Sequence, residues 1–273
     1  MRESDKNLNR RQFLQSTAIA VGAMAAVGAG VTYLQKVTAE NRINQDFLRP
    51  PGAIDESDFI YACIKCGLCV QICPINAIKL AGINEGLAYG SPYIDVRAQA
   101  CDFSCDSLQC VETCPTAALY FRQFKRAGEK AIQTYDATHK IDENYNPFPI
   151  QIMAMKTRVR MGMAQINENT CLAFQGKGFK GNPRGNDFKG INRSPYTNDP
   201  KATPVREKIY NEDPCNLCVK ECPIGGKAIV MEENTKKGGK ITPKVLKGCT
   251  GCGVCVMVCP TKEPSITVEP YKS

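Results

Sequence analysis

The sequence of 273 residues contains no tryptophan and a single histidine, His139. One imidazole is too few for a metal site built from several histidines, and it argues against a histidine-based catalytic triad. No Cys-x-x-Cys pair is followed by histidine, which argues against covalently attached haem. Outside residues 12–35 there is no long apolar run, so we expect the rest of the chain to be water-soluble. These absences leave cysteine as the residue type to examine.

Cysteine is abundant: 16 of the 273 residues, several-fold more than an ordinary soluble domain of this size carries. The 43% of residues counted as hydrophobic includes these cysteines, and about 37% of the chain is apolar without them, which is modest for a folded core. The length allows one large domain or two small ones. We therefore expect something other than aliphatic packing to organise the fold.

Residues 1–39 have the organisation of an export signal. Arg10 and Arg11 stand directly before an uncharged stretch, residues 12–35, and Val-Thr-Ala at 37–39 offers a small-residue cleavage site. The arginine pair resembles a twin-arginine signal, by which the Tat translocase exports folded proteins. The stretch is also long enough to span a bilayer, so an uncleaved leader that acts as an anchor stays open. We expect a periplasmic protein, associated with the inner membrane through a partner or this leader, and a linker at residues 40–62.

The cysteines form four sets of four, and each set ends in Cys-Pro. The sets are Cys63, Cys66, Cys69 and Cys73; Cys101, Cys105, Cys110 and Cys114; Cys171, Cys215, Cys218 and Cys222; and Cys249, Cys252, Cys255 and Cys259. The first and fourth sets have the spacing by which bacterial ferredoxins bind [4Fe-4S] clusters. Such a loop wraps around the cluster and supplies three thiolates, and Gly67, Gly251 and Gly253 suit it because they allow positive φ and close backbone approach.

A short strand-like run follows each Cys-Pro pair, at residues 77–80, 118–121, 228–231 and 265–268. Loop, short helix and strand, repeated in pairs, is the ferredoxin pattern. We therefore predict an α+β fold of two ferredoxin-like modules with two clusters each, with long irregular loops, four [4Fe-4S] clusters in all, and all sixteen cysteines as iron ligands.

The pairing of the motifs is open between a sequential and a nested arrangement. We favour nesting because the first and fourth sets share the compact spacing and the middle sets depart from it. Residues 63–100 and 245–273 then form an outer module around an inner module, residues 101–244, with a loop insertion at 172–214. The nested ligand sets are Cys63, Cys66, Cys69 and Cys259; Cys249, Cys252, Cys255 and Cys73; Cys101, Cys105, Cys110 and Cys222; and Cys171, Cys215, Cys218 and Cys114.

Zinc and disulfides are the competing uses of these cysteines. Tetrahedral zinc does not require triplets followed by x3-Cys-Pro, and adjacent Cys-x-x-Cys pairs are poor staples for long loops, so we rank both low.

A Gly-x-Gly-x-x-Gly pattern at 176–181 lacks a strand before it and a helix after it, so we expect no nucleotide cofactor. The surrounding insertion is rich in Gly, Asn, Lys and Pro and is expected to be a solvated surface loop rather than a docking surface for a redox partner. Residues 151–165 are expected to be a packing segment that bridges the modules.

Several blocks together resemble the NapG/MauM family of ferredoxin-type proteins. They are the twin-arginine leader, Leu48 to Ile54 (Leu-Arg-Pro-Pro-Gly-Ala-Ile), Cys63 to Leu80, Cys101 to Leu119, Arg160 to Gly162, Cys171 to Gly176, Cys215 to Pro223 and Cys249 to Pro260. Generic ferredoxins lack both the leader and the Leu-Arg-Pro-Pro-Gly run. Two features depart from the family: three residues separate Cys101 from Cys105, and the link from Cys171 to Cys215 is long.

The resemblance implies an electron carrier rather than an enzyme. It would take electrons from a NapH-like membrane protein that oxidises quinol and pass them to a periplasmic cytochrome or reductase, toward periplasmic nitrate reductase. An iron–sulfur subunit of another exported molybdenum enzyme, or of methylamine utilisation, and a zinc-binding adaptor are the alternatives. Removing residues 1–39 lowers the net charge from +8 to +5, and four clusters of about −2 each would make it slightly negative, so we expect no nucleic-acid partner.

Overall fold

The computed structural model describes residues 14–15, 22, 28–30, 47–139, 145–192, 203–235 and 238–271. Two compact units divide the chain, Met1–Gln45 and Asp46–Ser273, and the features below belong to the second. The predicted export signal at 1–39 lies outside the described residues except at six positions. Within the described ranges, no helix is both long and apolar enough to cross a membrane.

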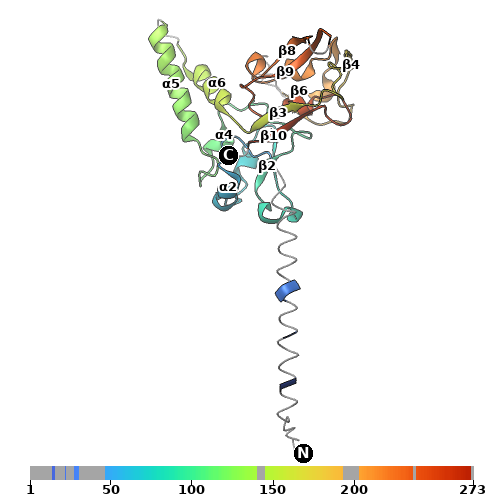
Figure 1. The fold of residues 1–273 in the computed structure, drawn as a ribbon. Helices are drawn as coiled ribbons and strands as arrows, with labels where there is room; N and C mark the ends of the chain where they lie inside the picture. Colours follow the sequence, from blue (N-terminus) through green and yellow to red (C-terminus); the bar gives the residue numbers. More distant parts are fainter. Residues whose placement is uncertain are drawn as a thin grey trace, which may run out of the picture. The chain divides into compact units, whose positions relative to one another are not determined.

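The first half of the second unit is a small module of short helices and strands, drawn in blue to green in Figure 1. Its elements are α2 (Glu56–Ala62), α3 (Leu68–Gln71), β1 (Ile78–Leu80), η1 (Ile83–Ala88), β2 (Pro92–Ile94) and α4 (Gln109–Glu112). Strand β1 pairs antiparallel with β2, with Ile78 opposite Ile94. A single antiparallel bridge between Ala53 and Leu119 closes the module by joining its first and last segments.

The run of residues 48–54 is built into this module. The Arg49 guanidinium donates to Ser91 Oγ at 2.9 Å and to the Pro92 carbonyl at 2.8 Å, which fixes the run against β2. Gly52 has φ +79°, and a Cβ at this position would lie 2.9 Å from the Phe124 ring. A glycine is therefore required there both for its conformation and for its close packing.

The second module repeats this plan with residues from the last part of the chain, drawn in yellow to red in Figure 1. Its elements are β3 (Gly162–Ile166), α7 (Leu217–Lys220), η3 (Gly225–Lys227), β8 (Ile229–Asn234), β9 (Lys240–Val245), α8 (Val254–Met257) and β10 (Ile266–Pro270). Strand β8 pairs with β9, and β3 pairs with β10, in both cases antiparallel. As in the first module, a segment before the first motif pairs with the strand that follows the last Cys-Pro.

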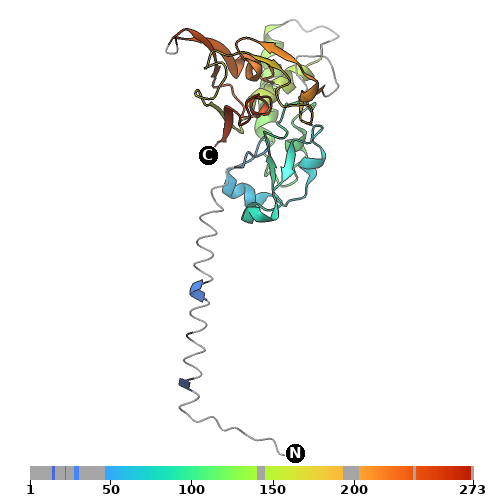
Figure 2. The ribbon, with the colours of Figure 1, turned by 90° about the vertical axis from the view of Figure 1, so that its right-hand side faces the viewer.

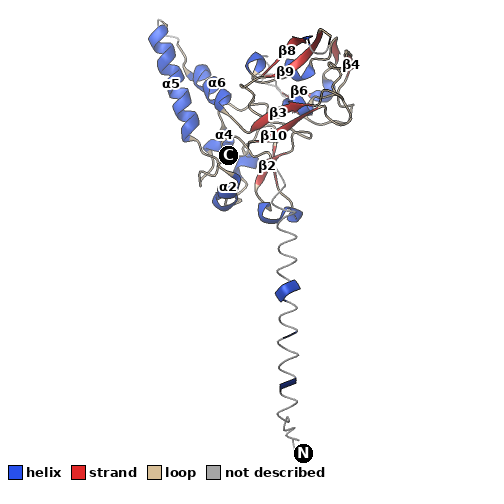
Figure 3. Ribbon diagram, viewed as in Figure 1, coloured by secondary structure: helices blue, strands red, loops and turns tan. Residues whose placement is uncertain are grey.

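Two helices connect the modules and lie side by side in Figures 1 and 3, α5 (Arg122–Thr138) and α6 (Phe148–Arg158). They pack closely at Gly128, where a Cβ would come within 2.6 Å of the Gln151 side chain. Ile152 and Met155 of α6 are buried. The expected packing segment at 151–165 is thus divided between α6 and β3, and both parts contribute to the core.

The insertion at 172–214 is more ordered than the solvated loop that we expected. It contains β4 (Phe179–Gly181), β5 (Ile191–Asn192), β6 (Thr203–Pro204), η2 (Val205–Glu207) and β7 (Tyr210–Glu212), with β4 paired to β7 and β5 to β6. Val205 and Asn192 are fully buried. Figure 2 shows the yellow-to-red part of the chain, which includes this region, from a second side. Part of the insertion therefore belongs to the packed core, although most of its described side chains are half-buried or exposed.

The strand pairing contradicts the nested division into an outer and an inner module. The first module closes through Ala53 and Leu119, and the second through β3 and β10, so each is continuous along the chain. The fold does contain the expected mixture of helices and strands, in two similar modules.

Candidate metal centres

In the first module, three cysteines of the first motif meet the last cysteine of the second. Cys63, Cys66, Cys69 and Cys114 line one hollow. We call it the Cys63 site. The pKa of the Cys69 thiol is raised to about 11 by burial and by the neighbouring thiols of Cys63, Cys66 and Cys114.

A second group in the same module has the reciprocal composition, Cys101, Cys105, Cys110 and Cys73, and we call it the Cys101 site. Burial and the neighbouring thiols of Cys105 and Cys73 raise the pKa of Cys110. The pKa of Cys101 is raised by its burial, and by Cys105 and Cys110. The last cysteine of each motif thus serves the other motif's site.

The second module has the same exchange of last cysteines. Two hollows in this module are each lined by four cysteines, which are Cys171, Cys215, Cys218 and Cys259 (the Cys171 site) and Cys222, Cys249, Cys252 and Cys255 (the Cys249 site). Burial, followed by the neighbouring thiols of Cys171, Cys215 and Cys259, raises the pKa of Cys218. Each of the sixteen cysteines therefore belongs to one group of four.

These groups correct the nested pairing. Cys114, not Cys259, completes the Cys63 site, and Cys222, not Cys73, completes the Cys249 site. The physical reason is helix packing: α3 contacts α4 and α7 contacts α8, and a motif's last cysteine follows each short helix. Motif spacing records how a loop wraps around one site, and it does not determine which other helix packs against it.

Backbone N–H groups point at the sulfur of the motifs' last cysteines. Ala77 donates to Cys73 Sγ at 3.3 Å, Leu119 to Cys114 Sγ at 3.4 Å, and Ser265 to Cys259 Sγ at 3.4 Å. In three of the four motifs, the third residue after the last cysteine has positive φ, and these residues are Asn76, Ala117 and Gly225. These donors would stabilise thiolate sulfur.

The wrapping loops have the conformations that the glycines predicted. Gly67, Gly251 and Gly253 have φ of +76°, +72° and +83°. A Cβ on Gly251 would lie 2.3 Å from the Gly162 nitrogen, so glycine there also permits β3 to approach. Lys65 takes φ 58° without being glycine, at the position in the first motif that Gly251 occupies in the fourth.

The four groups of cysteines fit a cluster of several metal ions better than a single ion. Burial disfavours a lone thiolate, as the raised pKa of Cys215, about 11, shows, and a bound cation reverses this effect. Within the described residues, no group of three or more His, Cys, Asp or Glu is arranged to hold a single ion. Tetrahedral zinc would hold its sulfur ligands only about 3.8 Å apart, given Zn–S bonds near 2.3 Å, whereas a four-iron cluster holds its thiolates at separate corners.

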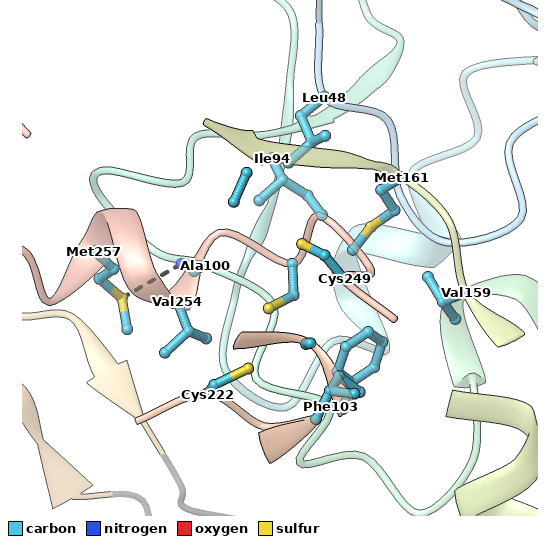
Figure 4. Close-up of a cluster of buried hydrophobic side chains, with 14 of the residues drawn as sticks. Leu48, Ile94, Ala100, Phe103, Val159, Met161, Cys222, Cys249, Val254 and Met257 are labelled. Atoms are coloured by element: carbon cyan, nitrogen blue, oxygen red, sulfur yellow. Dashed lines mark hydrogen bonds between the residues drawn. The ribbon is translucent and has the colours of Figure 1, made fainter. Parts of the chain in front are cut away.

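The Cys101 and Cys249 sites adjoin across the junction of the modules. The Cys101 N–H donates to the Cys252 carbonyl at 3.2 Å, and the Ala100 N–H donates to Met257 Sδ at 3.4 Å. Figure 4 shows Phe103 of the first module and Val254 of the second around the labelled cysteines of the Cys249 site. Cys222, Cys249 and Cys252 are buried, whereas Cys66 at the Cys63 site is exposed.

Comparison with known proteins gives the same grouping of motifs. The family described as "4Fe-4S dicluster domain" matches residues 62–118 and 213–262, so each match takes two consecutive motifs. The ferredoxin-type protein NapG of Escherichia coli K12 is 30% identical over 267 residues, which cover 96% of this chain and 85% of that protein. The chain belongs to the NapG/MauM family of ferredoxin-type proteins.

Other relatives in this family have similar coverage. The methylamine utilization ferredoxin-type protein MauM of Methylorubrum extorquens is 28% identical over 268 residues, covering 97% of this chain and 90% of that protein. NapG of Haemophilus influenzae is 27% identical over 279 residues, covering 99% and 75%. No solved structure matches the chain. The chain is thus a ferredoxin-type iron–sulfur electron-transfer protein with two dicluster regions, consistent with four [4Fe-4S] clusters.

Cys171 lies outside both dicluster matches, but the ferredoxin-type fold brings it to its predicted set. It is 44 positions before Cys215, and both line the same hollow. The Cys215 N–H donates to the Lys177 carbonyl at 3.2 Å, and Lys177 N–H donates to the Leu172 carbonyl at 2.8 Å. Through these two bonds, the end of the insertion at Cys215 lies beside its beginning at Leu172.

Two arginines that belong to no sequence motif hold the modules of this ferredoxin-type protein together. Arg97 donates to the carbonyls of Val256 and Cys259 at 2.8 and 2.9 Å. Arg184, from the insertion, donates to the carbonyls of Arg97 and Met257. Burial and the neighbouring Arg97 lower the pKa of Arg184 to about 10, so it stays charged at neutral pH. No spacing pattern marks either residue, because their partners are backbone groups far along the chain.

Proposed function

We propose that this protein holds four [4Fe-4S] clusters on its sixteen cysteines and relays electrons outside the cytoplasm. The electrons come from a NapH-like membrane protein that oxidises quinol. They pass toward a periplasmic nitrate reductase or its cytochrome donor. The observation that carries this proposal is the sorting of all sixteen cysteines into four groups of four. Each group would bind one cluster, and a cluster bound there supplies one-electron redox chemistry.

The chain's own residues provide ligation, hydrogen bonds and exclusion of water. Backbone N–H groups at 77, 119 and 265 reach ligand sulfurs, and such bonds raise a cluster's potential relative to a cluster without them. Cys222, Cys249, Cys252 and Cys259 are buried, which limits the access of solvent to these sites. The proposal of Tat export and periplasmic location rests on the arginine pair and uncharged stretch at residues 10–35.

Iron and acid-labile sulfide analysis, with EPR of the reduced protein, tests the cofactor content. We expect about sixteen iron atoms per chain. Stoichiometric zinc, or protein without metal, would overturn the proposal and favour a structural adaptor.

Partner identity separates this proposal from its closest alternatives. The similarity to MauM, 28% identical, favours a role in methylamine utilisation as the second candidate. Co-purification from solubilised membranes should recover a quinol-oxidising membrane protein. Recovery of a large molybdenum subunit, or of methylamine dehydrogenase components, would instead assign the protein to one of those systems.

A further inference from the structure

Exposed apolar side chains gather in one part of the first module. Of the fifteen large apolar side chains that are exposed among the described residues, eight lie between residues 61 and 89, and they are Tyr61, Ile64, Leu68, Ile72, Leu80, Ile83, Leu87 and Tyr89. Single exposed apolar residues are ordinary on any protein, whereas gathered ones mark an interaction surface. Ile83 and Leu87 are 80% and 72% exposed, so the surface that they offer is large.

Three of these side chains line the Cys63 site, and three others follow shortly after along the chain. Ile64, Leu68 and Leu80 line its hollow together with the cysteines. Ile83, Leu87 and Tyr89 belong to η1 and its end, directly after β1. The next residue, Gly90, packs on the Lys65 side chain, where a Cβ would lie 3.3 Å from Lys65 Cδ. We call the six residues Ile64, Leu68, Leu80, Ile83, Leu87 and Tyr89 the apolar rim.

The Cys63 site is one end of the series of four sites. It shares its module with the Cys101 site, which meets the Cys249 site through the hydrogen bond between Cys101 and Cys252. The Cys171 site is then the other end. The two ends differ in their exposed apolar side chains. Ile64, Leu68 and Leu80 of the Cys63 hollow are exposed, whereas no large apolar side chain that lines the Cys171 hollow is exposed.

We propose that the apolar rim docks the membrane-embedded electron donor of this protein, so that electrons are received at the Cys63 site. The inference rests on the proposed function and names the surface that it uses. An apolar rim suits a partner that is itself apolar at the membrane surface, whereas the Cys171 site, whose lining has no exposed large apolar side chain, suits a water-soluble acceptor.

The connection of the chain to residues 12–35 supports this choice of occupant. The Ile94 N–H donates to the Leu48 carbonyl at 2.8 Å, so the chain joins the fold at β2, the partner strand of β1, which carries Leu80. Only residues 36–47 separate the uncharged stretch from Leu48, a reach of about 43 Å at most. A retained leader would therefore hold the module that carries the rim close to the bilayer.

The test uses the double variant Ile83→Glu/Leu87→Glu, because neither residue lines the hollow. The matched control is Ile209→Glu, which places the same charge on an apolar side chain that is 75% exposed in the second module. Binding is measured by co-sedimentation of the full chain with host membrane vesicles that lack this protein. Reduction is measured as bleaching of visible absorbance when these vesicles are supplied with duroquinol.

We expect the double variant to bind the vesicles about tenfold more weakly or worse and to be reduced more slowly by duroquinol. Its iron content and its reduction by dithionite should match the wild type, and Ile209→Glu should behave as wild type throughout. Wild-type binding by the double variant would overturn the proposal. So would an equal loss of binding on protein-free phosphatidylethanolamine/phosphatidylglycerol liposomes, which would assign the rim to lipid.

A wild-type dimer that the double variant converts to a monomer would also overturn the proposal, because a second copy would then cover the rim. The iron content of the wild type is a separate readout. If it shows no clusters, the proposed function fails whatever the vesicle binding shows. If the wild type contains normal clusters and the double variant binds the vesicles as the wild type does, only the proposed docking role of the apolar rim fails.

Discussion

The backbone N–H of Cys101 donates a 3.2 Å hydrogen bond to the carbonyl of Cys252, which joins one cysteine loop directly to a loop of the other module. Around this bond, the Met161 N–H donates to the Thr250 carbonyl at 2.9 Å, and Arg97 donates to the carbonyls of Val256 in α8 and of Cys259 just after it. The two inner sites are thereby held next to each other, and the Cys63 and Cys171 sites are left at the ends.

Paired cysteine substitutions should distinguish sequential from nested pairing. Cys66→Ala/Cys114→Ala removes two ligands of one site and should leave about twelve iron atoms per chain. Cys66→Ala/Cys259→Ala removes one ligand from each of two sites and should leave about eight. Under nested pairing the first variant should keep about eight iron atoms and the second about twelve. Iron analysis of the two purified variants therefore distinguishes the two pairings.

Magnetic coupling should report which sites are neighbours. Cys66→Ala/Cys215→Ala keeps only the two inner sites, and its fully reduced EPR spectrum should show spin–spin broadening. Cys110→Ala/Cys255→Ala keeps only the two outer sites and should show separate, narrow signals, because dipolar coupling falls with the cube of distance. Both variants should retain about eight iron atoms, which controls for loss of fold. Broadening in the second variant alone would contradict the order of sites.

Two glycines with similar φ should differ in their tolerance of alanine. At Gly67 a Cβ would have nothing within 4 Å, so Gly67→Ala should cost only about 1–2 kcal/mol of backbone strain. At Gly251 the Cβ would meet Gly162 of β3. Gly251→Ala should displace β3 and lower the iron content from about sixteen to about twelve, through loss at the Cys249 site. Equal iron contents in the two variants would show that β3 does not approach as closely as described.

The insertion should stabilise the second module through Glu221, the residue before Cys222. Asn192, Lys208 and Tyr210 all reach this buried carboxylate, at 2.5, 2.6 and 2.8 Å. Burial, and then Glu221, raises the pKa of Tyr210, so its hydroxyl stays protonated and donates.

Glu221→Ala would leave Lys208 and Tyr210 without this partner and should lower the free energy of unfolding by about 3 kcal/mol. The thermal midpoint, followed by circular dichroism, should fall by about 5–10 °C. Glu232→Ala is the control, because its ion pair with Lys244 is exposed on both sides and should shift the midpoint little. A midpoint unchanged in Glu221→Ala would indicate that the insertion does not stabilise the module.

The sequence by itself determined the local features of this protein. Ligand loops, the turn conformations of Gly67 and Gly253 and the strands after three of the four Cys-Pro pairs follow from residues that are adjacent in the chain. The strand predicted at 118–121 was wrong, because that run forms only a single bridge at Leu119. The family could also be recognised from such runs, and residues 48–54 prove to pack against β2 and Phe124. Even the distant Cys171 could be assigned to its set, because no other cysteine was left for it.

Only the tertiary structure decided the pairing of motifs, the buried role of the insertion and the contact between Cys101 and Cys252. These features depend on which short helices pack together and on arginines whose partners are carbonyls more than seventy residues away. A carbonyl is present at every residue, so no residue type marks such a partner in the sequence. Cysteine spacing likewise describes the wrapping of one loop, whereas the helix that supplies the fourth thiol is chosen by packing within the module.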